Sequence, residues 1–142
     1  MQEYAIILGR NPDLSLLEIL CYFNRNNVKY NLKEYNEFLA ILELPDLDFK
    51  TVINQLGGAI KIGKLINLDD LIIDKNKITY SVSSFKSDKY KLIKILKNKF
   101  KTEKIKATVR YQSSRELTPS QSLMLNLELV SYKDKLFQIV AV

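Results

Sequence analysis

Histidine is absent from this chain of 142 residues, and cysteine occurs once. Without histidine the chain lacks the usual general base of an enzyme and the commonest protein ligand for metals. With only one cysteine as well, a zinc site is effectively excluded and no disulfide can form within the chain. We expect Cys21 to be a small, buried apolar residue.

Glycine is scarce too, with only Gly9, Gly57, Gly58 and Gly63. None of them forms the glycine-rich loop between a strand and a helix that holds a phosphate or a dinucleotide. The sequence therefore favours a binding surface over a catalytic centre. We predict no catalytic residue, metal or cofactor in this chain.

Long apolar runs are also missing, and none approaches the ~20 residues needed to cross a bilayer. The N-terminus, Met-Gln-Glu-Tyr, lacks the basic segment and cleavage site of a secretory signal, so we expect a cytoplasmic protein. A hydrophobic content of 46% without low-complexity tracts is typical of a folded chain. Its length suits one ordinary domain or two small ones.

Acidic residues are few in one window of the chain. Residues 86–115 hold 11 of the 22 basic residues and only two acidic ones, so the formal charge of this window is +9, against +6 for the whole chain. A concentrated positive field attracts polyanions. Nucleic acid is therefore the first partner to consider, and an anionic membrane surface the second.

The pattern of apolar residues predicts an α+β fold. Strands are expected at 3–8, 28–35, 37–44 and 59–66, with one helix after the first strand and another after the third. This is the split βαβ order of a ferredoxin-like domain, which we place at residues 1–68. Ser15 and Glu18 predict a capping box at the start of the first helix. The second helix is expected to begin at Asp48 and to end in a left-handed turn at Gly57-Gly58.

Residues 69–142 are predicted to form a second domain. It begins with a strand at 78–85 and a helix that Ser87 caps and that ends near Thr102. A strand at 106–112, a helix that starts with the capping box Thr118 to Gln121, and a hairpin of 129–132 and 136–142 follow. Because the last strand ends without a polar tail, we interpret the chain as a fragment of a longer protein.

The helix from Ser87 to Thr102 separates into two sides on a wheel of ~100° per residue. Its apolar residues gather on one side and its lysines on the other. A merely solvated lysine face is the alternative interpretation, but the charge continues onto the next strand and loop. Membrane binding is less expected, because the apolar side is needed for packing.

Strand alternation places Lys106 and Arg110 on one polar face, and the start of the next helix adds hydroxyl and N–H groups that suit a phosphate. Together these features predict one phosphate-binding surface. Tyr90 and Tyr111 could stack on unpaired bases, although a core position is commoner for each. The residues that we expect to contact RNA are Lys91, Lys94, Lys97, Lys101, Lys106, Arg110, Arg115, Thr118 and Ser120.

Four segments resemble the tRNA guanine-N2-methyltransferase family, which modifies position ten of tRNA. The most specific is Tyr-Ala-Ile-Ile-Leu-Gly-Arg-Asn-Pro-Asp-Leu-Ser at 4–15, followed by Glu18. The second is Gly-Gly-Ala-Ile-Lys-Ile-Gly at 57–63. The third, Val109-Arg110-Tyr111 with 116–120, is similar to the core of the family's THUMP domain. The fourth, 138–142, is similar to the strand that closes that domain.

The resemblance implies a ferredoxin-like domain joined to a THUMP domain, here residues 69–142, which together grip the acceptor end of tRNA. In the family a following Rossmann-type domain transfers the methyl group from S-adenosylmethionine. This chain has no Asp-Pro-Pro-Tyr-like motif, so no catalytic residue is carried over. We expect the catalytic domain to be supplied in cis or in trans, with S-adenosylmethionine as its cofactor and tRNA as the partner.

Two other functions remain open from the sequence. A ferredoxin-like module for protein interaction or regulation would need its lysines only for solubility, and would not bind RNA. A small acyl phosphate hydrolase is suggested by Arg10, which lies between the first strand and helix, but turn chemistry explains that segment as well.

Overall fold

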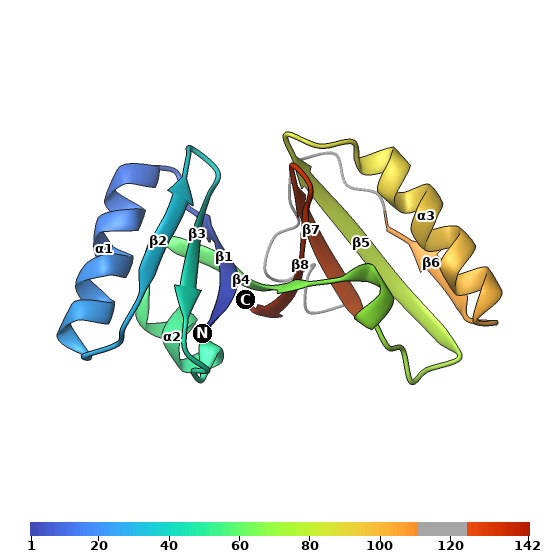
Figure 1. The fold of residues 1–142 in the computed structure, drawn as a ribbon, viewed down its shortest axis with the longest axis horizontal. Coiled ribbons are helices and arrows are strands. Elements are labelled where there is room, and N and C mark those ends of the chain that lie inside the picture. The colour runs from blue at the N-terminus through green and yellow to red at the C-terminus, as the bar shows by residue number, and fades with distance from the viewer. Residues whose placement is uncertain (111–124) are drawn as a thin grey trace. The chain divides into compact units, whose positions relative to one another are not determined.

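The computed structural model, which describes residues 1–110 and 125–142, divides into two α+β units (Figure 1). The first unit comprises Met1–Leu65 and Ile139–Val142, and the second comprises Ile66–Gln138. The predicted α+β class is confirmed. Within the described residues, no helix has both the length and the apolar character to span a membrane.

The first unit follows the predicted order of elements. Neighbouring strands in its sheet are antiparallel, in the order β2-β3-β1-β4. The central place of β3 agrees with its nearly continuous apolar sequence. The elements are β1 (Gln2–Leu8), α1 (Pro12–Arg25), β2 (Asn31–Tyr35), β3 (Leu39–Leu44), α2 (Phe49–Gln55) and β4 (Ala59–Ile66).

Both helices of this unit cover the same face of its sheet. Alternate residues of β1, namely Tyr4, Ile6 and Leu8, join residues of α1 and α2 in one buried cluster. Phe23 of α1 is fully buried at its centre. Burying a large apolar side chain stabilises a fold by about 1.5–3 kcal/mol, so this cluster holds the helices on the sheet.

The first helix begins earlier than predicted, and the capping box is wrong. Asn11 is the N-cap, and its Oδ1 accepts a hydrogen bond from Leu14 N at 3.2 Å. Pro12 occupies the first helical turn, where its fixed φ and missing N–H cost nothing. Ser15 therefore lies inside α1, and its hydroxyl is available for other contacts.

The predicted end of the second helix is also wrong. None of the four glycines has a positive φ. Leu56 ends α2 in an extended conformation, with φ −99° and ψ 122°. The glycines at 57 and 58 therefore have another structural reason, which the contacts of Gly58 provide below.

The predicted cap of α2 is confirmed and makes stability depend on pH. Asp48 accepts hydrogen bonds from Thr51 Oγ1 at 2.8 Å and Thr51 N at 3.4 Å. These bonds, the side-chain one foremost, lower the pKa of Asp48 below its ordinary value. Because the folded pKa is the lower one, the stabilisation is present at neutral pH and is lost as the pH falls through the folded pKa.

We therefore expect Asp48→Ala to lower the Tm by a few degrees at pH 7, since it removes the N-cap. The difference from wild type should shrink as the pH falls below the ordinary aspartate pKa of about 4, and it should be lost once the folded carboxyl is protonated at a lower pH. Thermal unfolding followed by circular dichroism at pH 7, 5 and 3 measures both effects. Asp74→Ala, at an exposed site in the other unit, is the control. A difference that stays constant with pH would contradict the role of the carboxylate.

The strands of the second unit follow the order β8-β7-β5-β6. Strand β5 is parallel to β6 and β7, and β7 is antiparallel to β8. The predicted helix at Thr118 lies outside the described residues. The elements are a 3-10 turn (Leu68–Asp70), β5 (Lys77–Phe85), α3 (Lys89–Thr102), β6 (Lys106–Val109), β7 (Leu127–Tyr132) and β8 (Lys135–Ala141).

The strand β8 has residues in both units. Its first residues belong to the second unit, whereas Ile139–Val142 belong to the first. Ala141 is 2% exposed and lies in the buried cluster of the first unit. The first unit is thus built from two segments far apart in the sequence.

Cys21 is exposed, so the prediction of a buried cysteine is wrong. Leu16, Ile19 and Phe23 supply the buried side of α1. Cys21 lies between these positions on the helix and points away from them, because i, i+3 and i+4 share a face and i+2 does not.

Candidate nucleic-acid interface

The helix α3 is fixed at its start by Asp88 and along its length by apolar contacts. Asp88 Oδ1 accepts hydrogen bonds from Tyr90 N at 3.0 Å and Lys91 N at 3.2 Å. Asp88 is thus the cap, and the predicted cap at Ser87 is wrong. On the inner side, Phe100 is 1% exposed and its ring centroid lies 5.2 Å from that of Tyr80 in β5.

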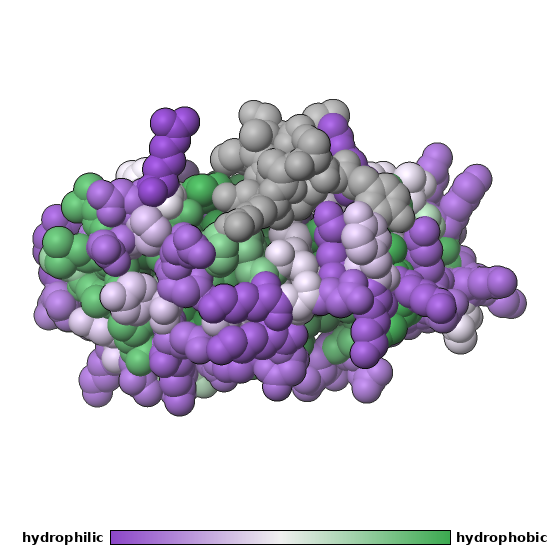
Figure 2. Space-filling view, turned by 90° about the horizontal axis from the view of Figure 1, so that it is seen from above, coloured by the Kyte–Doolittle hydropathy of each residue, from purple (hydrophilic) through white to green (hydrophobic). Residues whose placement is uncertain are grey.

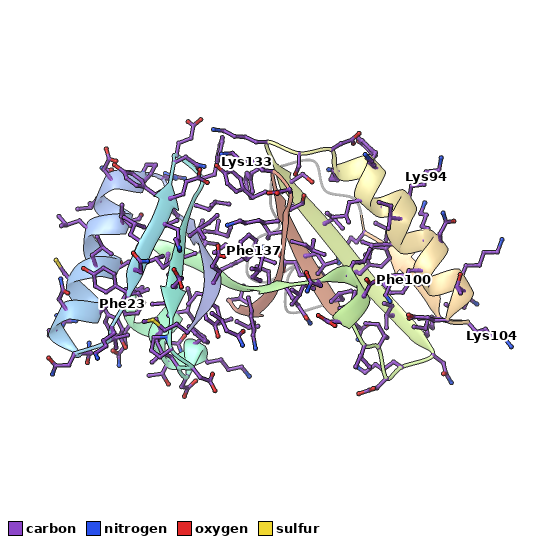
Figure 3. All side chains as sticks on the ribbon, in the orientation of Figure 1. Phe23, Lys94, Phe100, Lys104, Lys133 and Phe137 are labelled. Atoms are coloured by element: carbon purple, nitrogen blue, oxygen red, sulfur yellow. The ribbon has the colours of Figure 1, made fainter. Side chains whose placement is uncertain are left out.

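Four lysines lie on the outer side of α3 and form what we call the lysine stripe. They span ten residues, which is about 15 Å along the axis at 1.5 Å per residue. Figure 3 shows Lys94 directed away from the unit, whereas Phe100 points from the same helix toward the sheet. The space-filling view shows mostly hydrophilic side chains at this end (Figure 2). The members of the stripe, all exposed, are Lys91, Lys94, Lys97 and Lys101.

The charge of α3 is positive throughout, because no acidic residue occurs between Lys89 and Thr102. Lys99, beside the stripe, pairs with Glu103 four residues later, at 2.7 Å between Nζ and Oε1. Lysines in the last turn also favour the helix dipole, which gives part of this charge a structural role. The stripe itself concentrates positive potential on one side of one helix.

The structure does not bring Lys106 to the side that carries the lysine stripe. Ala107 and Val109 of β6 pack into the cluster beneath α3. Successive residues of a strand point to opposite faces, so Lys106 and Thr108 lie on the face away from α3. We expected one continuous basic surface on α3 and β6, but the structure divides it in two. The helix α3 packs on the apolar face of β6, so the polar face of β6 lies on the opposite side.

The remaining predicted residues have separate positions. Arg110 follows β6, is half-buried, and donates its backbone N–H to Tyr80 O at 2.8 Å. Tyr90 is 67% exposed, with Lys89 Nζ 5.6 Å from its ring centroid, so a core position is wrong for this residue. The predicted residues that lie outside the described ones are Tyr111, Arg115, Thr118 and Ser120.

A second polar cluster, which the sequence did not predict, joins the two glycine motifs of the first unit. Ser15 Oγ donates to Gly58 O at 3.0 Å and accepts from Gly9 N at 3.3 Å. Glu18 Oε1 accepts from Gly58 N at 2.8 Å. Ser15 and Glu18 thus tie α1 to the start of β4. The sequence did not reveal this contact, because a capping box and a helix-ending turn each explained these residues locally.

Arg10 borders a cavity of about 590 Å³ next to this cluster. Glu18 lines the same cavity, so a carboxylate faces the space in which an acyl phosphate would have to bind. This arrangement does not favour the hydrolase alternative. Among residues 1–110 and 125–142, no group of three or more acidic or cysteine side chains is placed to hold a metal ion.

No family model matches the chain, and no curated protein matches it. Among solved structures, the chain is similar to phospho-2-dehydro-3-deoxyheptonate aldolase (DAHP synthase) from Thermotoga maritima. The identity is 10% and the TM-score 0.33, over 83% of this chain and 42% of that one. A likeness of this size does not bear on function.

Proposed function

We propose that this chain is the tRNA-binding module of an S-adenosylmethionine-dependent tRNA guanine-N2-methyltransferase in the cytoplasm. The observation that carries the proposal is the lysine stripe, four exposed lysines on one side of a helix that has no acidic residue. Lysine is a compact point charge that suits backbone phosphates more than base edges. A surface of this kind would hold RNA through its backbone, and other parts would select the nucleotide.

The topology supports two domains of the expected kinds. The order β2-β3-β1-β4, with antiparallel neighbours and two helices on one face, supports the ferredoxin-like domain that we propose at residues 1–68. The parallel strands β5, β6 and β7 with the crossing helix α3 are compatible with a THUMP-like domain at 69–142. The cluster of Gly9, Ser15, Glu18 and Gly58 supports the resemblance, because it gives both glycine motifs one structural role.

In this proposal the chain binds and positions tRNA, and a methyltransferase domain in cis or in trans holds S-adenosylmethionine. Lys106 and Arg110 would contact a different part of the tRNA from the lysine stripe, because β6 directs its polar residues away from α3. Arg115, Thr118 and Ser120 stay as predicted contacts near the 3′ end. The chain alone would have no methyltransferase activity.

Binding of tRNA should weaken steeply with salt. If the stripe neutralises about four phosphates, the plot of log K against log salt should have a slope of about −2.8 to −3.6. A fourfold increase in salt would then weaken binding roughly 50- to 150-fold. Fluorescence anisotropy with labelled tRNA, titrated at several salt concentrations, measures the slope.

The matched ligand is the same tRNA without its single-stranded 3′ end. Acceptor-end recognition predicts weaker binding of this shortened tRNA at every salt concentration. Equal affinity for both, or affinity that does not change with salt, would contradict the proposal.

An alternative function in protein interaction has one observation in its favour. Leu14 and Leu17, about one turn apart on α1, are 61% and 58% exposed. A module that uses this face would bind a protein and leave tRNA unbound. The anisotropy titration separates the two functions, because the alternative predicts no change on adding the chain to tRNA.

A further inference from the structure

A groove lies within the second unit, between the start of α3 and the turn that joins β7 to β8. Its volume is about 350 Å³, within the range of small-ligand sites. Residues about 40 positions apart in the sequence meet there. They are Ser87, Asp88, Lys91, Leu92, Ile95, Ser131, Lys133, Asp134, Lys135 and Leu136.

The charge of the groove is positive on balance. Lys91 belongs to the lysine stripe, and Lys133 and Lys135 come from the β7–β8 turn, against the carboxylates of Asp88 and Asp134. The carboxylate of Asp88 already accepts hydrogen bonds from the first amides of α3. The groove therefore continues the positive surface of α3 onto the hairpin, at whose tip Figure 3 labels Lys133.

Two hydroxyl groups add hydrogen-bonding capacity at the same place. Ser87 Oγ and Ser131 Oγ are 2.6 Å apart, and Ser131 is only 7% exposed. In such a pair one O–H is donated to the other oxygen, and the second O–H is left to donate elsewhere. Ser87 is only half-buried, so this O–H can donate to a phosphate oxygen in the groove.

The apolar residues of the groove limit what else the ligand contains. Leu92, Ile95 and Leu136 line it, and Ile95 is 43% exposed although it lies on a helix rich in lysine. A phosphate alone would leave these side chains in contact with water. A phosphate that carries a base and a sugar would cover them.

We propose that this groove binds a nucleoside phosphate, with Lys133, Lys135 and the Ser87–Ser131 pair at the phosphate and the apolar residues under the nucleoside. The ligand is either one nucleotide of a bound RNA or a free nucleotide. In the first case the inference deepens the proposed function and rests on it. In the second case it stands on the groove alone.

The test uses the whole chain with Lys133→Gln and Lys135→Gln combined. The control is Lys29→Gln with Lys75→Gln, which removes the same charge from two exposed positions elsewhere. Against labelled tRNA, we expect the groove variant to weaken binding about tenfold and to reduce the salt slope by about one, because both lysines contact the same phosphate. The control variant should change both much less.

Free adenosine monophosphate, titrated into ¹⁵N-labelled protein and followed by NMR, distinguishes the source of the ligand. Shifts confined to 87–92 and 131–136 support a site for a free nucleotide. If these shifts occur and tRNA binds no form of the chain, the proposed function fails but the groove site stands. A tRNA effect without these shifts supports a nucleotide of RNA. If the groove and control variants bind tRNA equally and adenosine monophosphate causes no shift, the inference is overturned, whether or not the lysine stripe binds RNA.

Discussion

Charge reversal of three stripe lysines, Lys94→Glu, Lys97→Glu and Lys101→Glu, is expected to weaken tRNA binding about a hundredfold. An exposed ion pair contributes up to about 1 kcal/mol, so the loss of three contacts costs about 3 kcal/mol. The introduced carboxylates would also repel the phosphates. Anisotropy titrations at one fixed, low salt concentration measure the change.

The matched control is Lys29→Glu, Lys50→Glu and Lys75→Glu, all at exposed positions away from α3. Both triple variants take the net charge from +6 to 0, so they differ only in where the charge is lost. Circular dichroism and the Tm show whether α3 tolerates Glu in its last turn, where it opposes the helix dipole. Equal weakening by the two variants would mean that only the total charge matters, and would remove the support for the stripe as a site.

Replacement of Gly58 by alanine is expected to destabilise the first unit by about 1–3 kcal/mol, the cost of adding a methyl group where there is no room. A Cβ at this position would lie 2.7 Å from Ser15 Oγ and 3.2 Å from Ser15 Cα. The backbone of β4 would have to move, and the hydrogen bonds of Gly58 to Ser15 and Glu18 would weaken. Urea denaturation gives the free energy of unfolding.

Gly57→Ala is the control, because its Cβ would meet nothing closer than Glu18 Oε2 at 3.4 Å. The double variant Ser15→Ala with Gly58→Ala tests the cause directly. If the clash with the hydroxyl dominates, the double variant should lose less stability than the sum of the two single variants. Similar losses for Gly57→Ala and Gly58→Ala would contradict the close approach as the reason for Gly58.

The positions of strands and helices were predictable because the apolar pattern that specifies them also fills the core. The continuous run of β3 was read correctly from the sequence, and β5 lies at the expected strand 78–85, although its Ser81 and Ser83 are buried. The first residues of α1 and α3 could not be predicted, because two neighbouring residues can each act as the N-cap. Asn11, followed by Pro12, competes with Ser15 at α1, and Asp88 competes with Ser87 at α3. Local spacing does not decide between such neighbours.

The polar contacts that settle the competition are long-range. Ser15 bonds to Gly58, 43 residues away, and Ser87 bonds to Ser131, 44 residues away. A residue that looks like a cap in its local context was therefore used to join distant segments. No periodicity within a single element contains this information.

The part of the candidate site that lies on the single helix α3 could be predicted from the sequence. The wheel of α3 separates lysine from apolar residues, and the structure keeps that division. Alternation along β6 placed Lys106 correctly on the face opposite Ala107 and Val109, but it does not say which face α3 covers, so one continuous surface with the lysine stripe was expected. The lysines of the groove were missed because they follow the basic window by about 20 residues and meet α3 only through the pairing of β5 with β7.

The division of β8 between the units has a consequence for biosynthesis. Ala141 lies in the core of the unit that also contains Met1–Leu65. During synthesis the N-terminal segment emerges first, yet its packing cannot be completed until residues 139–142 have been translated. Contacts between distant segments close late and slow folding. The first unit must therefore stay partly assembled until Ile139–Val142 have been synthesised.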